Sequence, residues 1–206
     1  MTYAHSRRAQ TRHENEQRLL DAARHCFATV GLERTSIQDI VSRSGLSRGT
    51  FYNYLGSKEA AFEAVAAQIV AQVAEAVAAA RLRATDTRSF IVGPFEALVR
   101  VLAQDAETLA LVSLNGATLR TVLAGPGKVD SLESELRHDL QRAIAGGLLP
   151  EHNTTWMTAA MLGAALEVVT RIESEGDVDR AGAFLGELFL SALSGLTPTD
   201  GSGPTG

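Results

Sequence analysis

Apolar residues recur at steps of three and four along most of the chain, and alternating β-branched runs are nearly absent. This period is typical of amphipathic helices, so we expect an all-α fold. The first amphipathic helix is predicted from about Glu14 to Val30, where Gly31 stops it. Two short helices follow at about Ile37 to Ser44 and Arg48 to Tyr54, and a long alanine-rich helix runs from Lys58 into the low eighties.

The second half of the chain continues the helical period with clearer breaks. Pro94 stands where a new helix could begin, because proline is tolerated in a first turn. The run from Ala106 to Asn115 is apolar enough to be buried, and residues 125–127 (Gly-Pro-Gly) form the strongest break. Three further helices are predicted, at about Val129 to Ala145, Thr154 to Glu173 and Val178 to Leu193. The Gly/Pro/Thr/Ser-rich tail over 197–206 is expected to be disordered.

The stretch from Thr35 to Phe62 carries the most informative spacing. Gly45 separates the two short helices, as a helix-turn-helix requires of the residue that takes the left-handed conformation. Ser36 and Asp39 have the spacing of a capping box at the start of the first helix, and Ser47 can cap the second. The positions expected to face inward are Ile40, Val41, Leu46 and Phe51. The spacing therefore predicts a helix-turn-helix, and an ordinary helical hairpin with a glycine turn is the alternative.

Charge is distributed unevenly along the 206 residues, whose net charge is −5. Residues 1–58 hold nine Lys and Arg against five Asp and Glu, whereas residues 59–206 hold ten against nineteen. This basic N-terminal segment (residues 1–58, the head) on an acidic remainder suggests that only the head binds a polyanion. Outward side chains of the second short helix can contact base edges or phosphates: Arg48, Thr50, Asn53 and Tyr54. Lys58 at the start of the next helix suits a phosphate.

Residues 12–62 resemble the DNA-binding domain of TetR-family transcriptional regulators. The matching stretches are QRLLDAARHCFATVG, TSIQDI and SGLSRGTFYNYLGSKEAAF. The resemblance implies an N-terminal three-helix DNA-binding domain with a helix-turn-helix, joined to a larger helical ligand-binding and dimerisation domain. We place these domains at residues 1–57 and 58–196, before the tail. Four positions depart from the usual family residue, all at packing sites: Val41, Ser44, Leu55 and Ala61.

The resemblance also implies roles for particular residues in binding double-stranded DNA. Tyr52 and Lys58 match phosphate contacts, and Ser36 and Gln38 match contacts from the start of the preceding helix. The positions that match the recognition helix near base edges are Arg48, Gly49, Thr50, Asn53 and Tyr54. Arg7, Arg8 and Arg12 form either an arm that reaches a groove or a solvated tail.

TetR-like proteins couple a small-molecule pocket in the C-terminal domain to the DNA-binding heads. Pockets combine apolar walls with a few polar groups, and the central helices offer such walls. The candidate ligand-binding residues are Phe95, Leu98, Val99, Leu102, Leu111, Leu114, Asn115, Trp156, Met157 and Met161. We expect an apolar or amphipathic ligand, and for each apolar residue a place in the plain core is the alternative.

The last two helices are predicted to form a homodimer. The helix from Trp156 to Ile172 is apolar nearly all round, so it must be covered on more than one side. The helix from Val178 to Leu193 is also broadly apolar, and Gly182 and Gly186 on it would allow close helix approach. The candidate interface residues are Gly163, Leu166, Phe184, Leu185 and Phe189. A two-fold pairing of these helices would suit a pseudo-palindromic operator.

The remaining signals point to no catalytic, cofactor or metal site. Cys26 is the only cysteine, which excludes a disulfide scaffold within the chain. Glu135 and His138 have the spacing of a bundle metal site but lack the second copy that such sites need. With no signal-peptide pattern we expect a cytoplasmic protein. The sequence favours a repressor that a small ligand releases from its operator. The alternative is a helical-bundle carrier or enzyme with an incidental helix-turn-helix.

Overall fold

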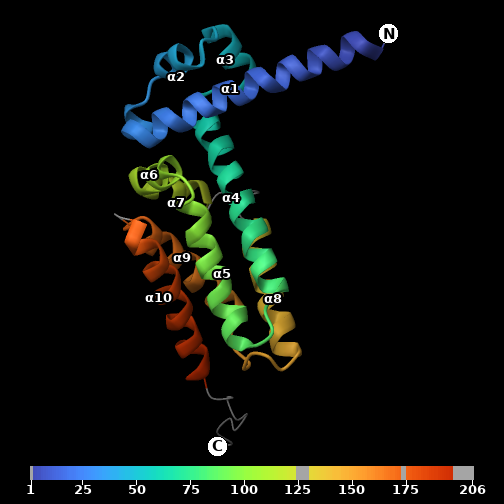
Figure 1. The fold of residues 1–206 in the computed structure, drawn as a ribbon, viewed down its shortest axis with the longest axis vertical. Coiled ribbons are helices and arrows are strands. Elements are labelled where there is room, and N and C mark those ends of the chain that lie inside the picture. Colours follow the sequence, from blue (N-terminus) through green and yellow to red (C-terminus); the bar gives the residue numbers. More distant parts are fainter. Residues whose placement is uncertain (1, 124–129, 173–174, 197–206) are drawn as a thin grey trace, which may run out of the picture. The chain divides into compact units, whose positions relative to one another are not determined.

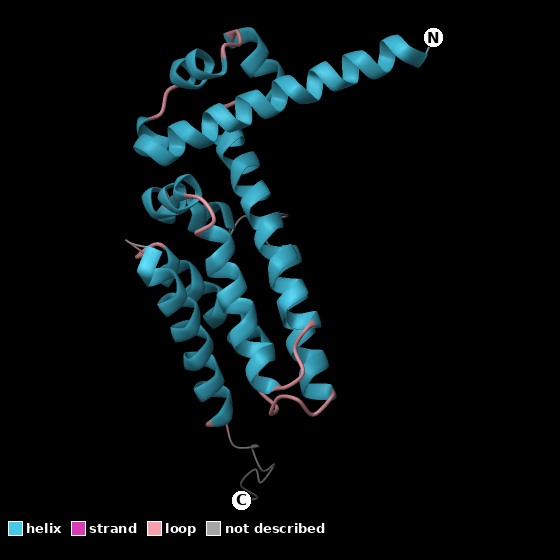
Figure 2. Ribbon diagram, viewed as in Figure 1, coloured by secondary structure: helices cyan, strands magenta, loops and turns pink. Residues whose placement is uncertain are grey.

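A computed structural model describes residues 2–123, 130–172 and 175–196. Helices joined by loops make up this part of the chain, with no strand in it (Figure 2). The helices are α1 (Thr2–Arg34), α2 (Ile37–Ser44), α3 (Arg48–Tyr54), α4 (Lys58–Leu82), α5 (Thr87–Leu102), α6 (Ala106–Leu114), α7 (Gly116–Leu123), α8 (Asp130–Ala145), α9 (Thr154–Val169) and α10 (Glu175–Ser194). The all-α prediction is therefore confirmed for the described residues. The predicted break at 125–127 and the tail lie outside them.

Some predicted helix ends agree with the structure, and others differ. The bounds of α2 and α3 are those predicted from the caps and the glycine turn. The first helix begins at Thr2 rather than near Glu14, and Gly31 interrupts it with φ 80°. Helix α9 ends at Val169, before the predicted Glu173.

The expectation that Pro94 stands in a first turn is wrong. Pro94 lies inside α5, which already begins at Thr87. Proline inside a helix leaves the carbonyl four residues earlier without its usual donor. The apolar stripe of α5 explains why the helix forms nevertheless: Ile91, Val92, Phe95, Val99 and Leu102 are all buried. Burial of this stripe outweighs the local cost of the proline.

The chain divides into two compact units that differ from the predicted domains. The first unit comprises Met1–Gln72 and Leu102–Leu123, and the second comprises Val73–Val101 and Ala124–Gly206. Helix α4 therefore contributes its first half to one unit and its second half to the other. Helices α6 and α7 belong with the N-terminal helices, although sequence alone placed them in the C-terminal domain. The predicted boundary at residue 57 stays a prediction.

A polar cluster holds α1 against α6 inside the first unit. Asn115 Oδ1 accepts a hydrogen bond from Leu32 N at 2.7 Å, and its Nδ2 donates to the carbonyl of Phe27 at 3.0 Å. Arg24 Nη2 lies 2.6 Å from Asp105 Oδ2. His25 Nδ1 lies 2.6 Å from Glu107 Oε1. These contacts fix the register of the two helices, since apolar packing alone leaves them free to slide.

The apolar core of the first unit lies between α1, the two short helices and α4. Phe27, Phe51 and Phe62 are fully buried, and the rings of Phe27 and Phe62 meet edge to face with centroids 5.3 Å apart. Cys26 is also buried in this unit, and burial raises the pKa of its thiol.

Helix α10 packs closely on α5 in the second unit (Figure 1). A Cβ placed on Gly186 would lie 2.8 Å from Val92 Cα, and one on Gly182 would lie 2.9 Å from Glu96 Cα. The rings of Phe95 and Phe189 stack beside this contact, with centroids 5.4 Å apart. The two glycines therefore permit a close helix approach, but within one chain rather than between two copies.

Helix α4 is long and apolar enough to cross a membrane by length and composition. A buried helix of a water-soluble protein passes the same test. Its apolar side chains serve the cores of both units, because Phe62 and Val65 are buried in the first and Val73 and Val77 in the second.

Candidate DNA-binding and effector sites

Helices α2 and α3 form a capped helix-turn-helix, as predicted. The Ser36 side chain accepts from Asp39 N and the Asp39 carboxylate accepts from Ser36 N, which completes the capping box. The hydrogen bonds from Ser36 lower the pKa of Asp39. Gly45 ends α2 in the left-handed conformation with φ 67°. Ser47 caps α3 by accepting from Thr50 N at 3.1 Å.

Side-chain packing and one arginine fix this motif on α1. Ile40 and Phe51 are fully buried, Val41 is buried and Leu46 is half-buried. Arg18 of α1 donates to the carbonyl of Ser44 at 2.8 Å, beside the C-terminus of α2. A cation at a helix C-terminus also complements the helix dipole. The orientation of α2 is therefore set by polar as well as apolar contacts.

The four residues that depart from the family pattern occupy buried positions. Val41, Ser44, Leu55 and Ala61 are all in the core. The Ser44 hydroxyl donates to the carbonyl of Val41 at 3.1 Å and accepts from Leu46 N at 3.3 Å. A hydroxyl in the core is tolerated here because both of its hydrogen-bonding roles are filled within the turn.

The outer face of α3 presents polar and aromatic side chains to solvent. Arg48, Gly49, Tyr52 and Asn53 are exposed, while Thr50 and Tyr54 are half-buried. Thr50 Oγ1 lies 2.8 Å from Ser47 Oγ. The Arg12 guanidinium lies 5.8 Å from the centre of the Tyr54 ring, within cation–π distance. Arg12 therefore lies beside α3, and it belongs to the helical α1 rather than to a flexible arm.

The remaining predicted DNA contacts flank α3. Ser36 and Gln38 are exposed at the start of α2, and Gln38 Nε2 donates to Ser42 Oγ at 3.1 Å. Lys58 begins α4 and donates to the carbonyl of Glu33 at 3.3 Å. The structure thus gathers all nine candidate residues on and beside one helix-turn-helix. Their contacts with DNA stay predictions.

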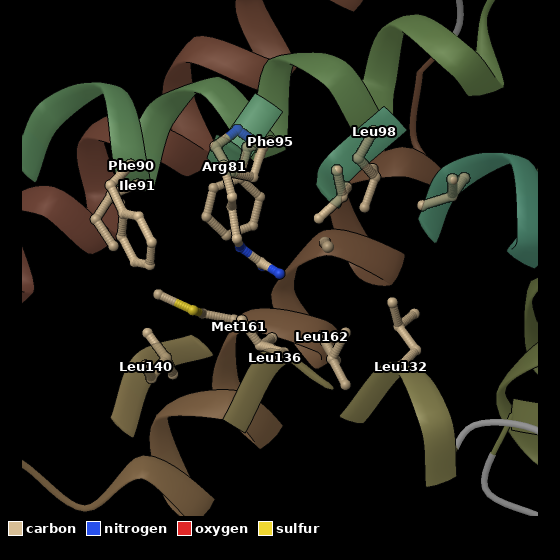
Figure 3. A pocket seen from close by; sticks show the side chains of 14 residues that line it. Arg81, Phe90, Ile91, Phe95, Leu98, Leu132, Leu136, Leu140, Met161 and Leu162 are labelled. Atoms are coloured by element: carbon tan, nitrogen blue, oxygen red, sulfur yellow. The ribbon is translucent and has the colours of Figure 1, made fainter. Parts of the chain in front are cut away.

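A cavity lies among α4, α5, α8 and α9 of the second unit (Figure 3). It contains about 550 Å³ of space, part of which is open to solvent. Its described lining is apolar except for one arginine: Val73, Val77, Arg81, Phe90, Ile91, Pro94, Phe95, Leu98, Leu132, Leu136, Leu140, Met161, Leu162 and Ala165. Such a lining suits an apolar ligand body.

Arg81 ties α4 to α8 at this cavity. Its Nη1 donates to Asp139 Oδ2 at 2.7 Å, and both side chains are mostly buried. Burial lowers the pKa of Arg81, while the charge of Asp139 and the hydrogen bond to it act in the opposite direction. Asp139 Oδ1 also accepts a hydrogen bond from the exposed Arg142. Sequence reasoning missed Arg81, because nothing in its position on an alanine-rich helix distinguished it from a solvated charge.

Three of the ten predicted ligand residues line the cavity: Phe95, Leu98 and Met161. Val99 is buried without lining it, Met157 is half-buried and Trp156 is 75% exposed. The other four belong to the first unit, namely Leu102, Leu111, Leu114 and Asn115. The Asn115 amide bonds to α1 and α6. The ligand roles of all ten stay predictions.

The five predicted dimer residues differ in exposure. Gly163 is exposed, Leu166 is half-buried and Phe184 is 58% exposed. Leu185 and Phe189 are buried in the core of the second unit, so the prediction that they form the dimer surface is wrong. They lie on the side of α10 that faces its own chain. Leu188, one turn after Phe184, is the exposed residue that the prediction missed.

No group of three or more His, Cys, Asp or Glu side chains in the described ranges could hold a metal ion. Glu135 and His138 both lie on α8, where sequence reasoning found no second copy of their spacing.

The N-terminal helices are similar to those of a known protein family. Residues 19–65 match the model of the bacterial regulatory proteins of the tetR family. The transcriptional repressor AcnR of Corynebacterium efficiens is 36% identical over 63 residues, which are 31% of this chain and 34% of AcnR. The chain thus matches about a third of the length of this curated relative.

Solved structures extend the likeness to the whole fold. The fatty acid degradation regulator FadR from Bacillus halodurans superposes with a TM-score of 0.72 at 20% identity, over 87% of this chain and 96% of FadR. FadR from Bacillus subtilis, solved with stearoyl-CoA, gives 0.70 at 19% identity, over 88% and 99%. The helix-turn-helix domain of this chain is therefore similar to that of the tetR family of bacterial regulatory proteins, and its whole fold is similar to that of these solved regulators.

Proposed function

We propose that this chain is a cytoplasmic transcriptional repressor that binds operator DNA and is released from it by a small apolar or amphipathic ligand. The observation that carries the proposal is the exposed polar face of α3 in a fully capped helix-turn-helix. A helix presented in this way fits the major groove, where side chains read base edges. AcnR, a relative of this domain, is named a repressor.

Residues on and beside α3 divide into two roles in this proposal. Arg48, Thr50 and Asn53 carry sequence preference, because their side chains can bond to base edges. Tyr52 and Lys58 contribute affinity for any duplex through phosphates. The nine Lys and Arg residues of the segment 1–58 supply a positive electrostatic field, which the acidic remainder of the chain lacks.

The cavity of the second unit is the proposed effector site. Its apolar lining suits a ligand that leaves water readily, and the fold is shared with a FadR that was solved with stearoyl-CoA. Release requires the ligand to favour a conformation that fits DNA poorly. Helix α4 is the proposed carrier of that change, since it begins in the DNA-binding unit and lines the cavity with Val73, Val77 and Arg81.

A homodimer built on α9 and α10 completes the proposal. Trp156 on α9 and Phe184 and Leu188 on α10 are large apolar side chains exposed in the single chain. Exposed apolar surface of this kind marks an interaction site. A two-fold pair of heads would read a pseudo-palindromic operator with half-sites about 34–36 Å apart.

The experiment that tests the proposed function measures DNA binding by fluorescence anisotropy. The probe is a labelled duplex from the chain's own promoter region, and binding is titrated over a range of salt concentrations. Lys58→Ala is expected to weaken binding to every duplex, because one phosphate contact is lost. The salt slope, which is the slope of the logarithm of the binding constant against the logarithm of the salt concentration, should become shallower by about one unit.

Arg83→Ala is the matched control for this variant. Arg83 is exposed in the second unit, so its replacement removes the same charge without touching the head. Binding and salt slope should then stay close to those of the unchanged protein. A folded Lys58→Ala protein with unaltered affinity and slope would show that the head does not dock as proposed.

A further inference from the structure

We propose that the ligand of the second-unit cavity is an apolar carboxylate and that Arg81 binds its carboxylate group. This inference rests on the proposed function, because it assigns a chemical class to the effector of that regulator. The ligand would place an alkyl or aromatic body against the apolar walls and its anionic end at the guanidinium.

The cavity combines a wholly apolar wall with one permanent charge. Among the described lining residues, Arg81 is the single member with a charged or hydrogen-bonding side chain. Figure 3 shows the Arg81 side chain among apolar side chains of the lining that come from α5, α8 and α9. Hydrocarbon and thioether groups offer a guanidinium little hydrogen bonding in return.

The acidic partners of Arg81 do not fully neutralise its charge. A guanidinium carries five N–H donors, and the hydrogen bond to Asp139 engages Nη1. Asp139 also accepts a hydrogen bond from Arg142, so two guanidinium groups share one carboxylate. Glu135 attracts Arg81 as well, but it is exposed on α8, where water screens its charge. A positive charge with donors to spare therefore remains at the cavity.

A carboxylate complements this arrangement better than a neutral group does. Arg81 keeps N–H donors beyond the one that bonds to Asp139, and arginine pairs with carboxylates in a planar, two-bonded geometry. A hydroxyl would accept a weaker hydrogen bond, and an ammonium group would repel the guanidinium. The apolar walls strengthen the pairing further, because the local dielectric constant is low.

The test compares three probes of equal chain length by isothermal titration calorimetry at pH 7: decanoate, decan-1-ol and decylamine. Decanoate is expected to bind roughly tenfold or more tightly than decan-1-ol, as a charged hydrogen bond provides, and decylamine should bind most weakly. Arg81→Met should remove the preference for decanoate and leave decan-1-ol within about twofold. Arg83→Met, on the exposed residue two positions later, should leave the preference intact.

Asp139→Asn separates ligand binding from a merely structural ion pair. Removing the Asp139 carboxylate removes the internal competitor for the guanidinium, so decanoate should bind several-fold more tightly. An Arg81 that only ties α4 to α8 would instead make both variants weaken binding in the same direction. If Arg81→Met does not fold by circular dichroism, Arg81→Gln replaces it.

Three results would overturn the inference: no binding of decanoate, equal binding of the three probes, or weaker decanoate binding by a folded Asp139→Asn protein. DNA binding is measured on the same preparation. Release of DNA by decan-1-ol but not by decanoate would overturn the inference and leave the proposed function standing. Binding of decanoate through Arg81 by a protein with no affinity for duplex DNA would uphold the inference and refute the proposed function.

Discussion

At the scale of single residues, polar side chains serve the fold in places where the sequence suggested a ligand. Asn115 offers the donors and acceptor that an effector could use, but its amide bonds to Leu32 N and to the Phe27 carbonyl instead. Both partners precede it by more than eighty residues. Arg81 shows the reverse, since an arginine with no distinguishing sequence signal lies at the apolar cavity. Which polar group meets a ligand depends on partners distant in the chain.

Asp105 provides a prediction about pH at this scale. Burial raises the pKa of its carboxyl, but hydrogen bonds from Thr108 and the charge of Arg24 lower it more, so the pKa lies below its ordinary value. A depressed pKa in the folded state stabilises the fold above the unfolded pKa of about 3.9, and this contribution disappears as the pH falls through the folded value.

Asp105→Asn should therefore lower the free energy of unfolding at pH 7 by about 1 kcal/mol. Asparagine can still cap α6 through its Oδ1, but the charge and the hydrogen bonds that Oδ2 accepts from Arg24 and the Thr108 hydroxyl are lost. Urea titrations across a range from about pH 3 to neutral measure the difference between the two proteins. The difference should shrink at the acidic end, where protonation of Asp105 removes its charge. A difference that stayed constant with pH would contradict the assigned role of the charge.

At the scale of helices, small residues decide how closely neighbouring elements approach. Sequence reasoning assigned the glycines of α10 to a dimer contact, whereas Gly182 and Gly186 face α5 of the same chain. A Cβ placed on Gly163 of α9 would meet no neighbouring atom of the described residues within 4 Å. Glycine thus has different consequences in the two helices, because the neighbouring helix decides whether a methyl group would fit at that position.

Gly186→Ala and Gly163→Ala form a matched pair that tests this difference. A methyl group at Gly186 would lie 2.8 Å from Val92 Cα, so the two helices must separate, and we expect a loss of about 1–3 kcal/mol. At Gly163 the higher helix propensity of alanine should give a gain of up to about 1 kcal/mol. Chemical denaturation measures both, and equal effects would refute the close packing of α10 on α5.

At the scale of the whole molecule, the two compact units carry the two proposed activities. The helix-turn-helix lies in the first and the cavity in the second, and α4 is shared between them. Helices α6 and α7 belong to the first unit, although they follow α5 of the second unit in the sequence. The chain therefore passes from the first unit to the second at Val73, returns to the first at Leu102 and re-enters the second at Ala124.

The proposed dimer yields a prediction at this scale. Phe184→Glu should give a monomer in sedimentation velocity at micromolar concentration, because the charge falls on the exposed apolar face of α10. That monomer should bind a full operator weakly. Leu82→Glu is the control, since Leu82 is 88% exposed just where α4 ends and its replacement should leave the assembly unchanged. An unchanged protein that sediments as a monomer would contradict the dimer.

Sequence by itself determined the helix-turn-helix almost residue by residue. The Ser36–Asp39 box, the left-handed Gly45 and the Ser47 cap are local signals, which act within one turn of backbone and so survive any tertiary context. The resemblance of the same short stretch to TetR-family DNA-binding domains implies the nine candidate DNA contacts.

Tertiary structure decided the rest, because those features depend on residues far apart in the chain. The side of α10 that is buried follows from its contact with α5, and the place of Arg81 at a cavity follows from the packing of four helices. The helical period of an apolar helix such as α9 leaves its buried side undetermined, since nearly every face is apolar. The cavity could not be located, and the exposed apolar side chains on which the proposed dimer rests could not be told from core residues, until the helices were packed.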